Sequence, residues 1–201
     1  MDAFATIVAR TPAPPGRTVL IAVDGVDGSG KTTFAARLAV EYQRTGRPAL
    51  LVHEDNFLNP RRVRYRLGRD SPDGFFRDTY DLAALTANVL DPLGRGGRRI
   101  TPAVFDHRAD APVDAEPVDV PADGVVIVEG MFLHRDELAG RWDLSVFLDV
   151  PFAETARRMA VRDGSDPDPE HPSLHRYVEG RRIYLSRCRP HERATLVIAN
   201  R

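Results

Sequence analysis

A glycine-rich stretch near the N-terminus, "GVDGSGKT" at residues 25–32, has the residue types and spacing of a phosphate-binding loop. It contains Lys31, which is the only lysine among the 28 basic residues of the chain. Glycines let a backbone turn sharply and bring successive N–H groups close to an anion. A lysine adds a compact, mobile positive charge, for which a planar guanidinium group is the wrong shape. The spacing therefore predicts that this loop binds the phosphate chain of a nucleotide.

The segments on either side of the loop give it the strand-to-helix context that the pattern requires. "TVLIAV" at 18–23 predicts a buried strand, and 31–44 predicts a helix with Phe34 and Leu38 on one face. Thr32 opens this helix, where its hydroxyl can ligate a magnesium ion while the helix N-terminus faces the phosphates. The expected nucleotide-binding residues are Gly25, Val26, Asp27, Gly28, Ser29, Gly30, Lys31, Thr32 and Thr33.

Composition narrows the kinds of partner that the chain is expected to bind. A formal net charge of −1 provides no basic field that would recruit nucleic acid. No apolar run reaches the roughly 18 residues of a membrane span, and the N-terminus does not resemble a signal peptide. A single cysteine, Cys188, excludes an intramolecular disulfide and suits a reducing compartment. We expect a cytoplasmic protein that binds small molecules, and a homo-oligomer remains open.

Apolar segments alternate with helical patterns along the whole chain. Strands are expected in 18–23, 48–55, 124–130, 143–150 and 194–200. Helices are expected over 2–10 with Asp2 as the cap, 31–44, 81–93 with Pro92 and the following glycines as the stop, 152–162 and 173–187. This alternation predicts an α/β fold, a five-stranded parallel sheet with helices on both faces. No regular structure is expected in 56–81 or 101–123.

The length of 201 residues predicts a single domain over 1–201. The N-terminal helix and its linker take up 1–16, and an acidic, proline-rich break places a lid region at about 163–175.

Acidic residues follow several of the predicted strands. In open α/β sheets the ligand lies outside the carboxyl ends of the strands, which here carry Asp55, Glu129 and Asp149. Phosphoryl transfer needs one carboxylate near magnesium and another that takes the proton of the attacking hydroxyl. Each of these acids could equally be a capping or turn residue. For Asp149, the simplest interpretation is a turn acid beside the following helix.

The ordered series of motifs resembles the uridine kinase and phosphoribulokinase family of P-loop kinases. It includes "VDGVDGSGKTTFAARLA", "HEDNF", "YDLAAL", "TPAVFDH", "VVIVEGMF", "VFLDV" and "ERATLVIAN", which together span most of the chain. The resemblance implies a P-loop NTPase fold. It also implies that ATP, with Mg²⁺, supplies a γ-phosphoryl group to the hydroxyl of a small-molecule alcohol.

The resemblance also implies roles for individual residues. Asp55 corresponds to the acid that accepts the hydroxyl proton, and Glu129 to the acid near magnesium, together with Thr32. Arg158 and Arg162 lie in the helix that leads into the lid, whose arginines clamp phosphates in the family. The expected catalytic residues are Asp55, Lys31, Glu129, Arg158 and Arg162. Those on the acceptor side are Asp55, Asp81, Phe105, Asp106, His107 and Arg108.

The acceptor side departs from the pattern of pyrimidine-nucleoside kinases. Phe105 stands where that branch has tyrosine, and His107 and Arg108 follow Asp106 directly instead of a few residues later. The best label is therefore a uridine kinase-like enzyme, with a kinase for another sugar-like or vitamin-like alcohol as the close alternative. His107 is either a neutral loop residue or a ligand donor. The cluster "RRVRYRLGR" at 61–69 either collects an anionic substrate or is a solvated surface.

The lid also differs from that branch. It is short and acidic where the branch carries further arginines, and Arg176, Arg181 and Arg182 are candidates to replace them. A GTPase switch would need an N-K-x-D motif, which the sequence lacks. A non-catalytic nucleotide sensor remains open beside the kinase.

Overall fold

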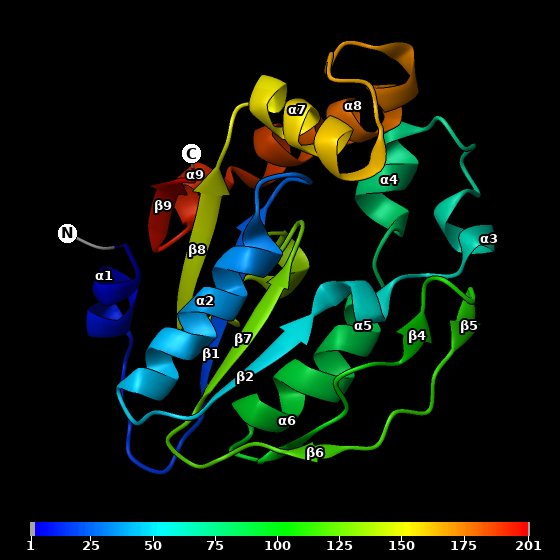
Figure 1. Ribbon diagram of the computed structural model, residues 1–201. Helices are drawn as coiled ribbons and strands as arrows, with labels where there is room; N and C mark the ends of the chain where they lie inside the picture. Colours follow the sequence, from blue (N-terminus) through cyan, green and yellow to red (C-terminus); the bar gives the residue numbers. More distant parts are fainter. Residues whose placement is uncertain (1–2, 201) are drawn as a thin grey trace.

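The computed structural model describes residues 3–200, which form a five-stranded sheet in the order β2-β7-β1-β8-β9 (Figure 1). The strands are β1 Val19–Gly25, β2 Ala49–His53, β7 Val125–Gly130, β8 Leu144–Asp149 and β9 Leu196–Ala199. All four neighbouring pairs are parallel. Each predicted strand is found, so the predicted α/β fold is confirmed. Because the strands are parallel, their carboxyl ends meet at one edge, where the phosphate loop begins.

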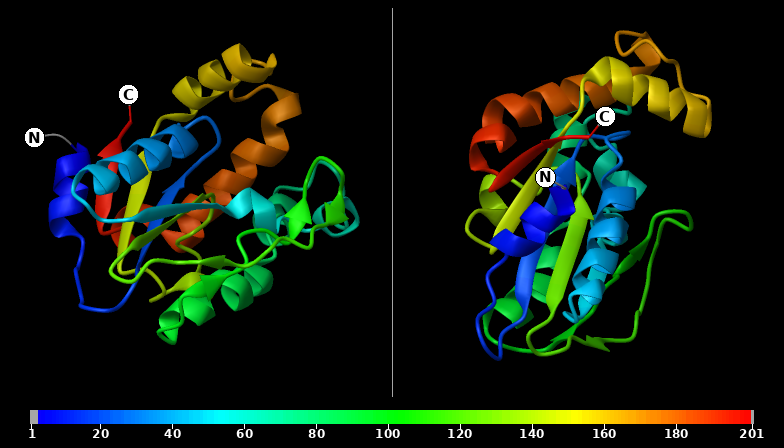
Figure 2. Two further views of the ribbon diagram at one scale, coloured as in Figure 1. Left: turned by 60° about the horizontal axis from the view of Figure 1, so that its bottom comes forward. Right: turned by 60° about the vertical axis from the view of Figure 1, so that its left-hand side comes forward.

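Side chains of β1 alternate between two apolar layers. Val19, Ile21 and Val23 pack with α1 (Ala3–Arg10) and α2 (Lys31–Arg44). Leu20 and Ala22 pack in a second cluster on the opposite face, beneath the helical segment from residue 82 to residue 94. Figure 2 shows α1 beside α2, well apart from the green helices of that segment. Helices thus cover both faces, as the continuous apolar strands predict. The predicted cap Asp2 lies outside the described residues.

The helix predicted over 81–93 is interrupted by a π-helical segment. It consists of α5 Leu82–Leu85, the π-helical Thr86–Leu90 and α6 Asp91–Gly94. Pro92 lies inside one continuous helical run, because Leu90 and Asp91 before it both have right-handed helical φ and ψ. The predicted stop is therefore wrong for Pro92 and confirmed for the glycines. The helix ends at Gly94, and Gly96 follows with a positive φ of 79°.

The segments 56–81 and 101–123 contain regular structure that the sequence pattern did not indicate. The first holds the end of a 3₁₀ turn, η1 Glu54–Phe57, then α3 Arg61–Arg64 and α4 Pro72–Asp78. The second, with residues 99–100, contributes two small antiparallel pairs: β3 Arg99–Ile100 with β6 Val118–Asp119, and β4 Phe105–Asp106 with β5 Ala111–Pro112. These elements have four to seven residues or only two, too short for periodicity to reveal. Because β2 ends at His53, Glu54 and Asp55 belong to η1 and not to the predicted strand.

Two helices cross above the carboxyl edge of the sheet, α7 Phe152–Asp163 and α8 His175–Cys188 (Figure 1). They match the helices predicted over 152–162 and 173–187 to within two residues. A 3₁₀ turn, η4 Pro172–Leu174, leads into α8, and α9 Pro190–Arg193 follows it. α8 packs on α4 so closely at Gly180 that a Cβ there would lie 2.6 Å from Cδ1 of Phe75. Within residues 3–200 no helix has the length and apolar character needed to cross a bilayer.

Candidate active site

The loop between β1 and α2 has the backbone geometry that its glycines predict. Gly28 and Gly30 have φ values of 74° and 82°, a region that favours glycine. A Cβ on Gly28 would lie 2.6 Å from the carbonyl oxygen of Thr155, and one on Gly30 would lie 2.8 Å from Nδ2 of Asn200. The same Nδ2 donates to the carbonyl oxygen of Ser29 at 2.7 Å. The loop is thus held between α7 and the end of β9.

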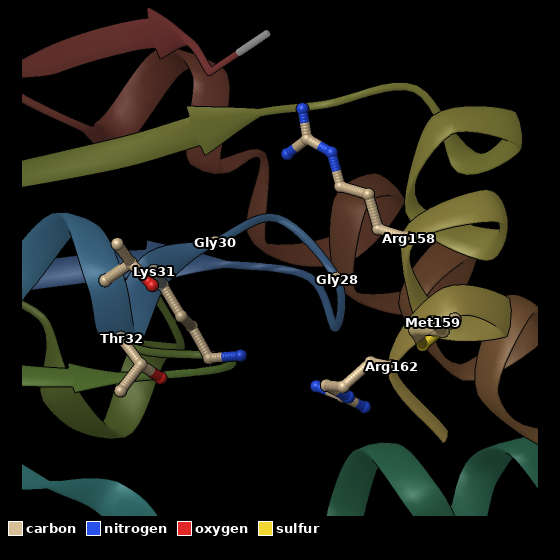
Figure 3. Close-up of a pocket in the computed structure, with 8 residues that line it drawn as sticks. Gly28, Gly30, Lys31, Thr32, Arg158, Met159 and Arg162 are labelled. Carbon is tan, nitrogen blue, oxygen red and sulfur yellow. The ribbon is translucent and has the colours of Figure 1, made fainter. Parts of the chain in front are cut away.

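A pocket of about 350 Å³ opens at this loop (Figure 3). Its lining residues are Gly28, Gly30, Lys31, Thr32, Thr33, Arg158, Met159 and Arg162. Lys31 and Thr32 project from the start of α2, and Arg158 and Arg162 project from α7 on the opposite side. The N-terminus of α2 has no side-chain cap, so its first N–H groups are available to an anion. The pocket therefore fits a phosphate chain.

Two cations hold Asp27 within the loop. Lys31 Nζ lies 3.9 Å from Oδ1 of Asp27, and Arg181 Nη2 donates to Oδ2 at 2.8 Å. Burial alone would raise the pKa of Asp27, but the charges of Arg181 and Lys31 hold it below its ordinary value. Arg181 is only 1% exposed and comes from α8, 154 residues away in sequence. This candidate lid arginine therefore contacts the loop directly.

The other two candidate lid arginines lie elsewhere. Arg182 pairs with Glu170 and Glu179 at the surface. Arg176 is buried against the segment between α3 and α4.

Glu129 and Thr32 meet beside Lys31, as the strand-end argument predicts. Thr32 Oγ1 donates to Oε1 of Glu129 at 3.2 Å, and Nδ1 of His53 lies 2.7 Å from the same oxygen. Oε2 of Glu129 is buried and has no hydrogen-bond partner in the described part of the chain. An orphaned carboxylate oxygen next to a hydroxyl suits Mg²⁺, which prefers oxygen ligands. The hydrogen bond to Glu129 raises the pKa of His53.

Asp55 lies at the same edge, in η1, and its side chain is exposed. Tyr80 Oη donates to Oδ1 of Asp55 at 3.0 Å. Burial, together with the charges of Asp55 and Glu54, raises the pKa of Tyr80 well above its ordinary value. Tyr80 therefore remains a neutral donor that orients the Asp55 carboxylate. Sequence analysis missed both Tyr80 and His53. The only signal for them is that each immediately precedes a motif acid, Asp81 or Glu54.

Glu54, the neighbour of Asp55, is fully buried, and within residues 3–200 neither of its carboxylate oxygens has a hydrogen bond of good geometry. Burial and the neighbouring charges of Asp24 and Asp55 raise the pKa of Glu54 well above its ordinary value. Its carboxyl group fills the space that a side chain at Gly130 would need. Of the two adjacent acids, only Asp55 is therefore placed to meet a substrate.

Asp24 itself belongs to a buried group behind the loop. Nδ1 of His134 lies 2.6 Å from Oδ2 of Asp24, and the Tyr184 hydroxyl donates to the same oxygen. Sequence analysis named none of these three residues. The acid that it set aside, Asp149, pairs with His191 at 3.1 Å.

The acceptor-side motifs lie next to η1, but several of their polar groups already form hydrogen bonds within the protein. Asp81 N donates to the carbonyl oxygen of Phe57, while Oδ1 of Asp81 accepts from Ala84 N at 2.8 Å and caps α5. Oδ1 of Asp106 accepts from the N–H groups of Arg108 and Ala109, and these bonds lower the pKa of Asp106.

Phe105 is buried, whereas His107 and Arg108 lie exposed on the β4–β5 turn. Val104 N donates to the carbonyl oxygen of Asn56 at 3.1 Å, which ties this hairpin to η1.

Comparison with known proteins identifies the family. The model of the Phosphoribulokinase / Uridine kinase family matches residues 20–166, which hold the loop, Asp55, Glu129 and α7. The chain belongs to this family. The members of this family are kinases, so membership implies ATP-dependent phosphoryl transfer.

Individual members of the Phosphoribulokinase / Uridine kinase family are distant from this chain. A uridine kinase from Ureaplasma parvum is 22% identical over 72% of this chain and 69% of its own length. A solved structure described as a possible uridine kinase from Bacillus stearothermophilus is 25% identical, covers 97% and 94% of the two chains and has a TM-score of 0.76. A structure from a Silicibacter species, provisionally named a fructose transport system kinase, is also 25% identical, covers 98% and 99% and has a TM-score of 0.74.

Proposed function

We propose that this chain transfers the γ-phosphoryl group of ATP to a hydroxyl group of a small alcohol, with Asp55 accepting the hydroxyl proton. The observation that carries the proposal is the position of Asp55. It is an exposed carboxylate, held by Tyr80, at the sheet edge that also carries the phosphate loop. Family membership supports phosphoryl transfer as the reaction type.

The nucleotide half of the site uses the loop and α7. ATP with Mg²⁺ supplies the phosphoryl group and the metal's positive charge. Backbone N–H groups of residues 25–33 hold the phosphates, and Lys31 follows the group that moves. Thr32 and Glu129 would hold the metal, since the buried Oε2 of Glu129 meets no other partner among residues 3–200. Arg158 and Arg162, on the facing wall of the pocket, stabilise the negative charge that develops.

The acceptor half uses η1 and the elements tied to it. Tyr80 occupies one oxygen of Asp55 and leaves the other for the substrate hydroxyl. An alcohol is a poor nucleophile at neutral pH, so a carboxylate that receives its proton helps as the new O–P bond forms. Asp81, Phe105, Asp106, His107 and Arg108 surround the acceptor in this proposal. Asp106 contributes mainly through Oδ2, because Oδ1 is engaged by two backbone donors.

The identity of the alcohol is a finer question. Uridine has the support of the named relatives and of one solved structure. A structure at the same identity is provisionally named a fructose transport system kinase. Phe105 lacks the hydroxyl that the pyrimidine-nucleoside branch carries at this place, and it is buried. We therefore propose an acceptor other than uridine as the preferred substrate.

The test is product analysis by phosphorus NMR with ATP, Mg²⁺ and a panel of alcohols, run beside binding of a non-hydrolysable ATP analogue. A new phosphate-ester signal that Asp55→Asn abolishes is the expected result. A folded protein that binds the analogue but phosphorylates none of the alcohols would instead be a nucleotide sensor. Failure to bind the analogue would reject both functions.

A further inference from the structure

Three guanidinium groups surround a single aromatic ring on the acceptor side. The ring is that of Tyr65, immediately after α3, inside the arginine-rich stretch at residues 61–69. The guanidinium carbon of Arg176 lies 4.9 Å from the ring centroid, that of Arg69 lies 5.4 Å away and that of Arg64 lies 5.6 Å away. Two of these arginines come from the stretch itself, and the third comes from the first turn of α8. We call these three arginines the Tyr65 cluster.

Arg176 fixes the shape of this stretch. Its Nη1 donates to the carbonyl oxygens of Gly68 and Arg69 at 3.2 and 3.0 Å, and its Nη2 donates to that of Arg64 at 3.0 Å. A further, longer bond from Nη1 reaches the carbonyl oxygen of Ser71 at 3.4 Å. Arg176 is therefore a positioning residue, and its buried charge remains beside Tyr65.

The positive charge of the Tyr65 cluster is poorly compensated. No carboxylate in the described part of the chain pairs with Arg176 or Arg69. The one ion pair of Arg64 reaches Asp110 at 3.5 Å, and its Nε is buried with no partner. Burial is the main cause that lowers the pKa of Arg176. The charge of Arg64 also lowers it, and the smaller opposing effects of Tyr177, Tyr65 and Asp70 do not cancel this shift. An anion bound here would relieve repulsion between like charges and form charge-assisted hydrogen bonds with the guanidinium groups.

A neighbouring arginine shows that carboxylates are within reach of this stretch. Arg66 donates from Nε and Nη2 to the two oxygens of Asp78 at 2.9 and 2.7 Å. Its charge is therefore neutralised by a bidentate pair. Arg64 and Arg69 lie two and three residues away in sequence without such a pair. A merely solvated surface would not surround one ring with unpaired charges and bury a donor among them.

The Tyr65 cluster is linked by the chain and by hydrogen bonds to the segments that hold the proposed base. Three residues separate η1 from α3, and one of them, Asn59, donates from its N–H to the carbonyl oxygen of Thr79 at 2.9 Å. The next residue, Tyr80, forms an isolated β-bridge with Leu58 and holds Asp55.

On the other side, Asp110 of the β4–β5 turn accepts from Arg61 N at 2.9 Å. Figure 1 shows α3 between α4 and the β4–β5 hairpin, so the cluster flanks the acceptor half of the site.

We propose that the acceptor is an anionic alcohol, whose phosphate or carboxylate group binds Arg64 and Arg69 while its hydroxyl faces Asp55. This inference rests on the proposed kinase function. In the reaction the substrate oxygen bonds to the γ-phosphorus, the bond from that phosphorus to the bridging oxygen of ADP breaks, and the hydroxyl proton passes to Asp55. A neutral nucleoside would leave the charges of the Tyr65 cluster unpaired.

The first experiment compares a neutral alcohol with an anionic counterpart in two pairs, of which the amide and carboxylate pair is nearly isosteric. Ribose is compared with ribose 5-phosphate, and glyceramide with glycerate, by ADP release and phosphorus NMR. We expect kcat/KM to be about a hundredfold higher for the anionic member of one pair, as charge-assisted hydrogen bonds predict. The pair that responds tells whether the anion is a phosphate or a carboxylate. Equal use of both members of each pair, or a preference for uridine, would overturn the proposal.

The second experiment removes the charges one at a time. Arg64→Ala and Arg69→Ala should each raise KM for the anionic alcohol about tenfold and leave KM for ATP nearly unchanged. The exposed Arg69 should be removed without a change in thermal midpoint, whereas Arg64→Ala also loses the Asp110 pair and lowers the midpoint. Arg69→Lys should recover part of the loss. Arg187→Ala, an exposed arginine on α8, is the matched control and should behave as the parent protein. Unchanged KM in both alanine variants would show that the charges only shape the surface.

A binding measurement separates failure of this inference from failure of the kinase function. Ribose 5-phosphate and glycerate are titrated into the protein by calorimetry with the loop filled by Mg²⁺ and a non-hydrolysable ATP analogue. Binding that weakens in the Arg64→Ala and Arg69→Ala variants supports the anion site even before turnover is examined. Turnover of neutral alcohols without any binding of these anions would leave the kinase function standing and reject the anion site. Loss of analogue binding would reject the kinase function itself.

Discussion

The two halves of the site handle positive charge in opposite ways. Around the phosphate loop, cations already face carboxylates: Lys31 and Arg181 face Asp27, Arg158 contacts Glu154, and Arg162 contacts Asp163. Around Tyr65 three arginines lie over one ring, and within residues 3–200 only Arg64 pairs with a carboxylate, that of Asp110 at 3.5 Å. Paired cations keep their geometry when the pocket is empty, but they must exchange partners when phosphates bind. Unpaired cations need not give up a carboxylate partner, so the binding of an anion stabilises them by more.

This difference suggests separate tasks. The nucleotide half is organised in advance for a ligand that every family member shares. In our proposal, the acceptor half keeps charge available for a ligand that varies between members. Variants in the two halves should therefore change different kinetic constants.

The largest effect is expected at Asp55. Asp55→Asn keeps the shape of the side chain but removes the proton acceptor, so kcat should fall by about 10² to 10⁴-fold. Affinity for an ATP analogue should remain close to that of the parent protein, because the loop holds ATP. Asp149→Asn, at the end of β8, is the matched control and should keep its kcat. A folded, ATP-binding Asp55→Asn protein with full kcat would remove Asp55 from the chemical step.

Lys31→Arg should lower kcat by about 10² to 10³-fold although the charge is kept. A guanidinium fork does not fit the compact position beside Asp27, and it cannot follow the moving phosphoryl group. Unlike Asp55→Asn, this change should also weaken binding of the ATP analogue, which calorimetry measures. If Lys31→Arg and Asp55→Asn change the affinity for the ATP analogue equally, the division of the site into a nucleotide half and an acceptor half is wrong.

Arg162→Ala and Arg158→Ala should each lower kcat about tenfold and leave the fold intact. Both side chains line the pocket opposite Lys31, where negative charge develops during transfer. Arg157→Ala provides the control, since Arg157 lies on the same helix but not among the residues that line the pocket. Kinetics that match the parent protein in both pocket variants would make these arginines part of the helix surface only.

The smallest effect concerns stability and its dependence on pH. Because the pKa of Glu54 is raised in the folded protein, folding favours the protonated form, and stability falls as pH rises above about 4.5, the ordinary value, toward the folded pKa. Glu54→Gln removes this loss, so its thermal midpoint should match that of the parent protein near pH 4 and exceed it by a few degrees near pH 8. Midpoints that differ by the same amount at both pH values would show that folding does not raise the pKa of Glu54.

Much of the nucleotide half could be predicted from the sequence. The loop spans eight residues, and its glycines, Lys31 and Thr32 act through local backbone geometry. Strand ends predicted that Asp55 and Glu129 would meet at one edge, because parallel strands bring their carboxyl ends together. The helix that carries Arg158 and Arg162 was predicted as well, and it lies opposite the loop. Each of these features was predicted from a short segment of sequence or from the alternation of apolar strands with helices.

The acceptor half was predicted only in part. Asp81 and Phe105 do lie near η1, but Asp81 also caps α5, as any aspartate before a helix can. The stretch at 61–69 left two interpretations open, because a run of arginines has the same composition whether its charges are paired or not. The partners decide between them: Arg66 has Asp78, and Arg69 has no carboxylate in the part of the chain that the structure describes.

What the sequence by itself determined is the loop, the five strands and the family to which their order belongs. Only the tertiary structure decided which partners the functional side chains have. Tyr80 meets Asp55 across 25 residues, Arg176 meets Arg64 across 112, and Arg181 meets Asp27 across 154. Such contacts depend on how α8 packs over the sheet edge and on α4, which is a property of the folded core. The spacing of residues along the chain predicts local backbone geometry. Burial, charge pairing and pKa depend instead on neighbours that only folding brings together.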